Sequence, residues 1–217
     1  MNGPALLDTL EGDDRRRLLA KSHRHRFAPG EIIFHEGDPS DCVHLIERGH
    51  VAIRISTPLG DVATLTILGP GAAFGELALI DGNQPRSADA VAIRAVETRV
   101  VNRGEFEALR RDHPQIERFL VALLAAQIRR LSALTLETMF VPADTRVLRR
   151  LLAVAELFGE GNGSVIPLTQ DDLASMAGTT RPTANRVLKR AETDGLLHLT
   201  RGRIEILDAE QLARRAR

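Results

Sequence analysis

The chain has 217 residues, of which 43% are hydrophobic, and its 29 Lys and Arg residues balance 29 Asp and Glu residues. These values are typical of a soluble globular protein of one or two domains, and the zero net charge gives no sign of binding to nucleic acid through charge alone. Cys42 is the only cysteine, which excludes an internal disulfide and a cysteine-ligated cluster. The chain has no signal-peptide pattern and no apolar run near 18 residues, so we expect a cytoplasmic protein with no membrane partner.

The segment from about Arg26 to Val101 has the pattern of a series of short strands. Turn residues such as Gly49 and Pro58-Leu59-Gly60 separate short apolar runs, and apolar side chains alternate with small or polar ones over residues 51–55. Strands at a spacing of roughly 8–12 residues favour a β-sandwich or jelly roll. The expected strands cover residues 32–34, 43–46, 51–55, 62–68, 90–93 and 98–101, after a helix expected over residues 6–20.

A run of polar and turn residues lies near the end of this region, from Phe74 to Ala88, with the sequence FGELALIDGNQPRSA. It combines a glycine turn, the acid Glu76, a flexible loop, Arg86 and Ser87. A guanidinium can neutralise a phosphate through directed hydrogen bonds, and a carboxylate can accept a hydrogen bond from a sugar hydroxyl. These residues therefore suit a sugar phosphate, although a lone Glu–Arg pair is more often a surface ion pair.

A long helix is expected from Pro114 to about residue 140, because no Gly or Pro interrupts that segment. A coiled-coil seam with 4-3-4-3-4 spacing runs along it, through Leu120, Leu124, Gln127, Leu131, Leu134 and Thr138. The same stripe would fit a helix packed on its own domain, but a helix that joins two domains favours dimerisation. We interpret Phe140 to Asp144 as the interdomain hinge, with Asp144 as the N-cap of the next helix.

The C-terminal part has the order of elements of a winged helix-turn-helix. Thr169 to Asp172 form a capping box that starts a helix over residues 171–177, and Gly178 supplies the turn. A second helix is expected from Pro182 to Thr193, followed by two strands that a turn at Arg201-Gly202 joins into the wing.

The second helix has the composition of a DNA-recognition helix, with four basic residues and no acidic one between Arg181 and Arg190. A basic, solvated helix face would give the same composition, but the capping box, the turn glycine and the wing occur in the order that favours DNA binding. The first residues of a recognition helix reach base edges, where arginine pairs with guanine, and wing arginines suit phosphates. The expected DNA-binding residues are Thr169, Thr180, Arg181, Thr183, Arg186, Arg201 and Arg203.

The strand-rich region with FGELAL…PRSA, the long apolar helix and the winged helix, in this order, resemble the CRP–FNR family of bacterial transcription regulators over essentially the whole chain. The resemblance implies an α+β fold with a cyclic-nucleotide-binding jelly roll over residues 1–113, a dimerisation helix over 114–140 and a winged helix-turn-helix over 141–217. It also implies a homodimer paired through residues 114–138, palindromic double-stranded DNA as target and RNA polymerase as a partner.

The resemblance assigns roles to the residues of the candidate sugar-phosphate site. Glu76 matches the acid that accepts from the ribose 2′-OH, Arg86 the base that pairs with the cyclic phosphate, and Ser87 a hydroxyl that touches the phosphate. The turn whose backbone lines the pocket corresponds to Gly75, Leu77 and Ala78. Leu131 and Ser132 align with the adjacent Thr and Ser that contact adenine in the cAMP-responsive activator. The expected ligand is therefore a cyclic nucleotide, most readily cAMP, with cGMP as an alternative, because Leu131 cannot hydrogen-bond the exocyclic amine.

The recognition helix also departs from the family pattern. The family's Arg-Glu-Thr…Arg run reads Arg181-Pro182-Thr183…Arg186 here. The two arginines predict two guanines in each half-site. Pro182 in place of the glutamate predicts an altered or relaxed base preference in the inner part of the half-site.

Two other functions fit parts of the pattern. A regulator of the same architecture could be independent of ligand or respond to another small effector, which Leu131 supports. A nucleotide-sensing module of an enzyme fits less well, because the chain has no Ser-His-Asp set, no phosphate-binding GxxxxGK[ST] loop and no second pair of acids; we expect no enzymatic activity. We also expect no metal, since an isolated His23-x-His25 ahead of the first expected strand is more often a surface feature.

Overall fold

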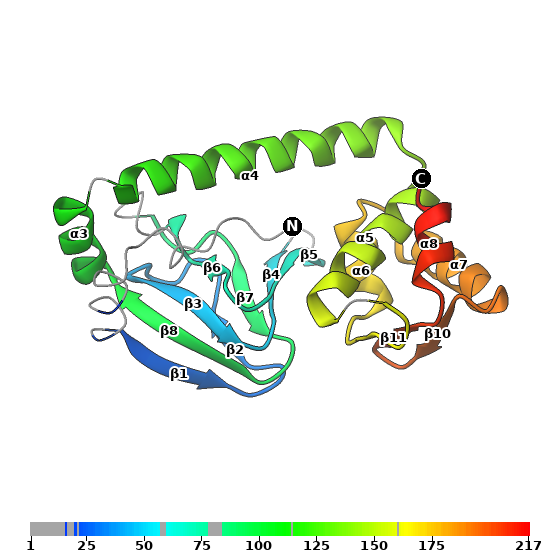
Figure 1. Ribbon diagram of the computed structural model, residues 1–217, viewed down its shortest axis with the longest axis horizontal. Coiled ribbons are helices and arrows are strands. Elements are labelled where there is room, and N and C mark those ends of the chain that lie inside the picture. The colour runs from blue at the N-terminus through cyan, green and yellow to red at the C-terminus, as the bar shows by residue number, and fades with distance from the viewer. Residues whose placement is uncertain are drawn as a thin grey trace. The chain divides into compact units, whose positions relative to one another are not determined.

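The computed structural model describes residues 16, 20, 22–56, 60–77, 84–113, 115–159 and 161–217 (Figure 1). Ala78, Pro114 and most of the helix expected over residues 6–20 lie outside this part of the chain. The chain divides into two compact units, Met1–Ser56 with Ile67–Arg130 and Thr57–Thr66 with Leu131–Arg217.

The first unit is built on two four-stranded sheets, as the strand pattern predicts. One sheet has the order β1 (His23–Phe27), β8 (Val96–Asn102), β3 (Cys42–Arg48), β6 (Ala73–Phe74). The other has the order β2 (Ile32–Phe34), β7 (Asp89–Ala92), β4 (Val51–Ser56), β5 (Val62–Leu68). Residues 62–66 of β5 are assigned to the second unit and residues 67–68 to the first. Strands distant in sequence are therefore neighbours, as a jelly roll requires. Figure 1 shows β1, β8 and β3 side by side.

Strand β1 corrects one expectation, since His23 and His25 do not precede the first strand but lie on it. The strand has the sequence HRHRF, and its first four residues are exposed. Its register comes from antiparallel pairing with β8, where His23 faces Val100 and Phe27 faces Val96. An edge strand that buries so little has no apolar alternation, which is why the sequence pattern missed it.

The core of the first unit lies between its sheets. It contains Ile46, Val51, Phe74, Ala90, Ala92 and Val96, all buried, with Phe27 and Phe34 packed against them. Val51 and the adjacent Ala52 are both fully buried, so β4 begins with both faces covered instead of the single buried face that the alternation predicts.

Two helices follow β8, namely α3 (Arg103–Asp112) and α4 (Gln115–Phe140). Leu120 of α4 is only 6% exposed and belongs to the core, so it is not available to a second helix. Val121, Ile128 and Leu131 are 64%, 65% and 54% exposed. Together with the half-buried Leu124 they form a 3-4-3 stripe. It shares Leu124 and Leu131 with the predicted seam and has Val121 and Ile128 in place of Leu120 and Gln127.

By length and composition, α4 is also long and apolar enough to cross a membrane, with a mean hydropathy of 1.5 in its most apolar window from Ile116–Phe140. Arg129 and Arg130 stand near the middle of the helix and are both exposed. Two charged side chains at the centre of a bilayer would be costly, whereas a second helix needs only the apolar stripe. The expected absence of a membrane partner stays a prediction.

The second unit has the winged-helix order. Its elements are α5 (Ala143–Phe158), β9 (Val165–Ile166), α6 (Gln170–Met176), α7 (Arg181–Thr193), β10 (Leu197–Thr200), β11 (Arg203–Ile206) and α8 (Ala209–Arg215). The capping box of α6 is present, and Gly178 has the positive φ, 59°, that the turn to α7 needs. The wing is wider than expected, because the two-residue strand β9 adds a third strand beside β11.

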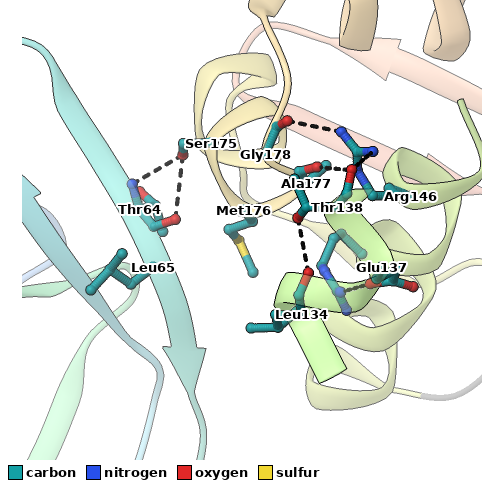
Figure 2. Close-up of a pocket in the computed structure, with 11 residues that line it drawn as sticks. Thr64, Leu65, Leu134, Glu137, Thr138, Arg146, Ser175, Met176, Ala177 and Gly178 are labelled. Carbon is teal, nitrogen blue, oxygen red and sulfur yellow. Dashed lines mark hydrogen bonds and ion pairs between the residues drawn. The ribbon is translucent and has the colours of Figure 1, made fainter. Parts of the chain in front are cut away.

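Arg146 fastens the end of α4 to the helix-turn-helix, as Figure 2 shows. Its side chain is buried and donates to the carbonyls of Thr138, Val141, Ala177 and Gly178 at 3.2, 2.7, 2.8 and 2.9 Å. The expected hinge is thus reduced to Val141 and Pro142 between two helices. Asp144 is not the N-cap of α5, because the helix starts after Pro142 without a side-chain cap and Asp144 lies in the first turn.

A segment of strand β5 packs against α6 within the second unit (Figure 2). Thr64 donates from Oγ1 to the buried carboxylate of Asp172 at 2.6 Å, and its N–H donates to Ser175 Oγ at 3.0 Å. A cavity of about 180 Å³ lies beside this contact, lined among others by Leu65, Leu134 and Met176. Arg146 also lines the cavity, but its side-chain donors are bound to backbone carbonyls and are not available to an anionic ligand there.

Candidate functional site

The candidate site is centred on Arg86, which lies in a segment without regular secondary structure and is held by backbone bonds. Its N–H donates to the Asp38 carbonyl at 2.9 Å, and its own carbonyl accepts from the Gly37 N–H at 2.8 Å. These bonds fix the Cα of Arg86 and direct its side chain inward, where the residue is only 5% exposed.

The groups that the Arg86 guanidinium contacts directly are neutral. Nη1 donates to the Gly75 carbonyl at 3.1 Å, Nη2 donates to Cys42 Sγ at 3.2 Å, and Cζ lies 4.2 Å from the centroid of the Phe34 ring. Nε is buried and has no hydrogen-bond partner. Among the described residues, no carboxylate forms an ion pair with Arg86. A buried cation without an anion is costly, so this arrangement indicates a site for an anionic ligand.

Gly75 lets the chain approach the guanidinium closely. Its φ is +78°, and a Cβ built on it would lie 2.4 Å from Arg86 Nη1. Any other residue at this position would have a strained backbone and would push the guanidinium away. This explains why the turn at Gly75-Glu76-Leu77 begins with a glycine.

His44 lies beside the site and adds no second charge. Burial, and then the nearby Arg86, lower the pKa of His44 to about 4, so the ring is neutral at neutral pH. Its Nδ1 lies 3.2 Å from Thr98 Oγ1, and the ring stacks on Phe74 at 4.9 Å between centroids. Together with Phe34 these rings form an apolar wall next to the cation.

The other predicted ligand residues are placed as follows. Glu76 follows Gly75 directly and is half-buried; burial raises the pKa of its carboxyl, which a backbone hydrogen bond and Arg86 lower in part. Leu77 is 48% exposed, and Ser87 is exposed next to Arg86. Leu131 and Ser132 are exposed on α4 in the second unit, and their contact with a base stays a prediction.

Sequence reasoning missed the partners that hold Arg86. Cys42 is 44 positions away from it, and Phe34 and the Gly37–Asp38 backbone are also remote in sequence. Nothing in the local sequence signals these contacts, because strand pairing creates them.

The predicted DNA-binding face is exposed on α7. Arg181 lies 3.2 Å from Asp171, and Arg186 donates to both carboxylate oxygens of Asp144 at 3.0 and 2.6 Å. All four side chains are exposed, so the pairs are weak and can be exchanged for phosphates or bases. Thr180 and Thr183 bring their hydroxyl oxygens to 3.1 Å.

The remaining predicted DNA contacts lie at the wing and at the start of α6. Arg201 is exposed on the turn between β10 and β11, and Arg203 is exposed at the first position of β11. Thr169 is exposed, but its hydroxyl donates to Asp172 Oδ2 at 2.6 Å and accepts from the Asp172 N–H at 3.1 Å. A phosphate contact from Thr169 would therefore have to replace a bond of the capping box.

Comparison with known families agrees with both halves of this description. Residues 24–113 match the cyclic nucleotide-binding domain, and residues 145–215 match the Crp-like helix-turn-helix domain.

Relatives match over most of the length of the chain. The chain is 34% identical over 195 residues to the CRP-like cAMP-activated global transcriptional regulator of Mycobacterium tuberculosis, covering 88% of this chain and 87% of that protein. It is 33% identical over 213 residues to the cyclic AMP receptor protein of Thermus thermophilus, covering 98% and 96%. The chain belongs to the CRP family. The crystal structure of the Thermus thermophilus catabolite activator protein matches 98% of each chain, with 32% identity and a TM-score of 0.57.

This CRP-family chain is a cyclic-nucleotide-binding transcription regulator with a helix-turn-helix. Its relatives are named as transcription regulators and a cyclic AMP receptor, which supports a regulator over the sensing module of an enzyme. Over the described part of the chain, no group of three or more His, Cys, Asp and Glu side chains could hold a metal.

Proposed function

We propose that the protein is a homodimeric transcription regulator whose DNA binding is controlled by cAMP. The observation that carries the proposal is Arg86, a buried guanidinium with one unpartnered nitrogen, whose two hydrogen-bond acceptors are both neutral. A cyclic phosphate would supply the missing anion through charge-assisted hydrogen bonds. Glu76 would accept the ribose 2′-OH, and Gly75, Leu77, Ala78 and Ser87 would complete the sugar-phosphate half of the site.

The homodimer is supported by the exposed stripe on α4. Val121, Leu124, Ile128 and Leu131 repeat at coiled-coil spacing, and three of them are more than half exposed in the single chain. A second copy of α4 would bury this stripe. Leu131 and Ser132 would then lie on or beside the helix pair, where a base under the helix could reach them.

The DNA-binding output is supported by α7 and the wing. A dimer would present two α7 helices to successive major grooves of a palindromic duplex, roughly 34 Å apart, with Arg181 and Arg186 at the base edges. cAMP can change this binding only as far as it binds the two dimer arrangements with different affinity. Such a regulator would act in the cytoplasm, together with RNA polymerase, and would need no metal.

A second candidate is the same regulator with a different effector, such as cGMP. The observation that favours it is Leu131, which is exposed where the cAMP-responsive activator has a hydroxyl side chain. A leucine cannot hydrogen-bond the exocyclic amine that distinguishes adenine.

Calorimetric titration with cAMP and with cGMP tests the proposal. We expect cAMP to bind the wild-type chain, and Arg86→Leu to show no heat of binding. Arg26→Leu, which removes an exposed arginine from β1, is the matched control and should bind as the wild type does. Heat from cGMP alone would favour the second candidate. No heat from either nucleotide, or equal binding by Arg86→Leu, would contradict the assignment of the site.

A further inference from the structure

Cys42 stands at the first position of β3, with its sulfur against the guanidinium that we assign to the phosphate. Sγ accepts from Arg86 Nη2 at 3.2 Å and lies 3.7 Å from His44 Nε2. Asn102 is its neighbour across the sheet. The side chain is half-buried, and it is the only cysteine in the chain.

The guanidinium has few other acceptors. Nη1 is bound to the Gly75 carbonyl, and Nε is buried without any partner. If position 42 were aliphatic, Nη2 would lose its acceptor as well, and a flexible side chain would have little to hold it over the Phe34 ring. If position 42 were acidic, a carboxylate would pair with Arg86 and cancel its charge. A thiol avoids both outcomes, because sulfur is a weak, neutral acceptor.

The charges around the sulfur support this role. Burial raises the pKa of the Cys42 thiol, the nearby Asp41 adds to this and Arg86 opposes it, so the thiol is neutral at neutral pH. His44 on the same strand is neutral as well, because its pKa is lowered to about 4. Of the groups next to the sulfur, the thiol itself and His44 are neutral, Arg86 is a cation, and the Asp41 carboxylate lies close enough to raise the pKa of the thiol.

We propose that Cys42 is a positioning residue of the phosphate site: its neutral thiol holds the Arg86 guanidinium in place and leaves the charge available to a ligand phosphate. A phosphate oxygen is a stronger acceptor than sulfur and would take over Nη2 when the nucleotide binds. The bound ligand would then cover the thiol, so ligand binding and chemical modification of Cys42 would exclude each other. This inference rests on the proposed binding of a cyclic nucleotide at Arg86.

Two variants and a matched control test the role by calorimetry on the full chain with cAMP. Cys42→Ser keeps a neutral acceptor and should bind within ~3-fold of the wild type. Cys42→Asp places an anion beside Arg86 and should weaken binding by ~30-fold or more. Thr200→Asp adds the same charge at an exposed position of β10 in the second unit, and should bind as the wild type does.

Alkylation by N-ethylmaleimide, an uncharged reagent, gives an independent measure on the wild-type chain. The thiol adds to the maleimide double bond, its proton ends on the neighbouring carbon, and mass spectrometry counts the single adduct. At a cAMP concentration of 100 Kd the reaction should slow by up to about 100-fold, because about 1% of the sites are free. The Arg86→Leu chain should be alkylated at the same rate with and without cAMP.

The outcomes separate this inference from the proposed function. If the wild type binds cAMP but Cys42→Asp binds equally well, or if bound cAMP leaves the alkylation rate unchanged, Cys42 does not position Arg86. If Cys42→Asp does not fold, the alkylation of the wild type decides alone. If the wild type binds no cyclic nucleotide, the proposed function fails first, and the inference about Cys42 fails with it.

Discussion

Replacing Arg86 by Met separates a ligand-binding arginine from a structural one. In the ligand-free chain, the side chain gains two hydrogen bonds to neutral acceptors, about 1.5 kcal/mol each, and a cation–π contact of about 2 kcal/mol. Against these stands the desolvation of a buried ion without a counter-ion, which costs several kcal/mol. The terms nearly cancel, so the free energy of unfolding should change by only about 1 kcal/mol. Cyclic-nucleotide affinity should nevertheless fall by about 100-fold or more, because the phosphate loses its cation.

Arg146 is the matched control, a second buried arginine with the opposite surroundings. Its guanidinium donates four hydrogen bonds to backbone carbonyls. Arg146→Met removes these bonds and leaves four acceptors unpaired, so the free energy of unfolding should fall by about 3–5 kcal/mol.

The assay is urea unfolding of both variants, followed by circular dichroism because the chain has no Trp or Tyr to report by fluorescence. Calorimetry with cAMP on the same samples measures the loss of binding. If Arg86→Met destabilises the ligand-free chain as much as Arg146→Met does, Arg86 is a structural residue and not a ligand-binding one.

Three further predictions concern the output, the dimer and the acid of the site. Asp144→Asn frees Arg186 from an exposed ion pair and should tighten DNA binding by about two- to fivefold in fluorescence anisotropy; weaker binding would mean that the pair orders α7 for DNA. Ile128→Glu should give a monomer in sedimentation, while Arg129→Glu, which lies off the stripe, should stay dimeric. If both variants stay dimeric, the dimer interface does not include this stripe. Burial raises the pKa of Glu76, so as the pH falls its carboxylate becomes protonated at a higher pH than an ordinary glutamate does. Nucleotide affinity should fall over that pH range in the wild type and not in Glu76→Gln. An identical pH profile for both chains would exclude Glu76 as the acceptor of the ribose hydroxyl.

The sequence predicts elements with strong local signals. The capping box from Thr169 to Asp172, the positive φ of Gly178 and the two-residue turn at Arg201-Gly202 depend on neighbouring residues only, and all three are present. Strands β1, β6 and β9 escaped prediction, because β1 has almost no buried face and β6 and β9 have only two residues each. Such strands form because they pair with neighbouring strands, and the periodicity of the sequence does not reveal this pairing.

The candidate site was predictable only in part for the same reason. The segment from Gly75 to Ser87 indicates a phosphate site because the residues that form the motif are close together in the sequence. Two neutral contacts of Arg86 come from Cys42 and Phe34 on other strands, which no local pattern connects to it. The predicted seam on α4 includes the buried Leu120, because the sequence cannot tell which leucine its own domain buries.

The most direct test of the account is to measure DNA affinity as a function of cAMP. The full chain would be titrated onto a labelled palindromic duplex, selected from a random pool by the protein itself, with and without saturating cAMP. The account predicts that cAMP shifts the anisotropy isotherm of the wild type and leaves that of Arg86→Leu unchanged. Identical isotherms for the wild type with and without cAMP, under conditions where calorimetry shows the nucleotide bound, would contradict it.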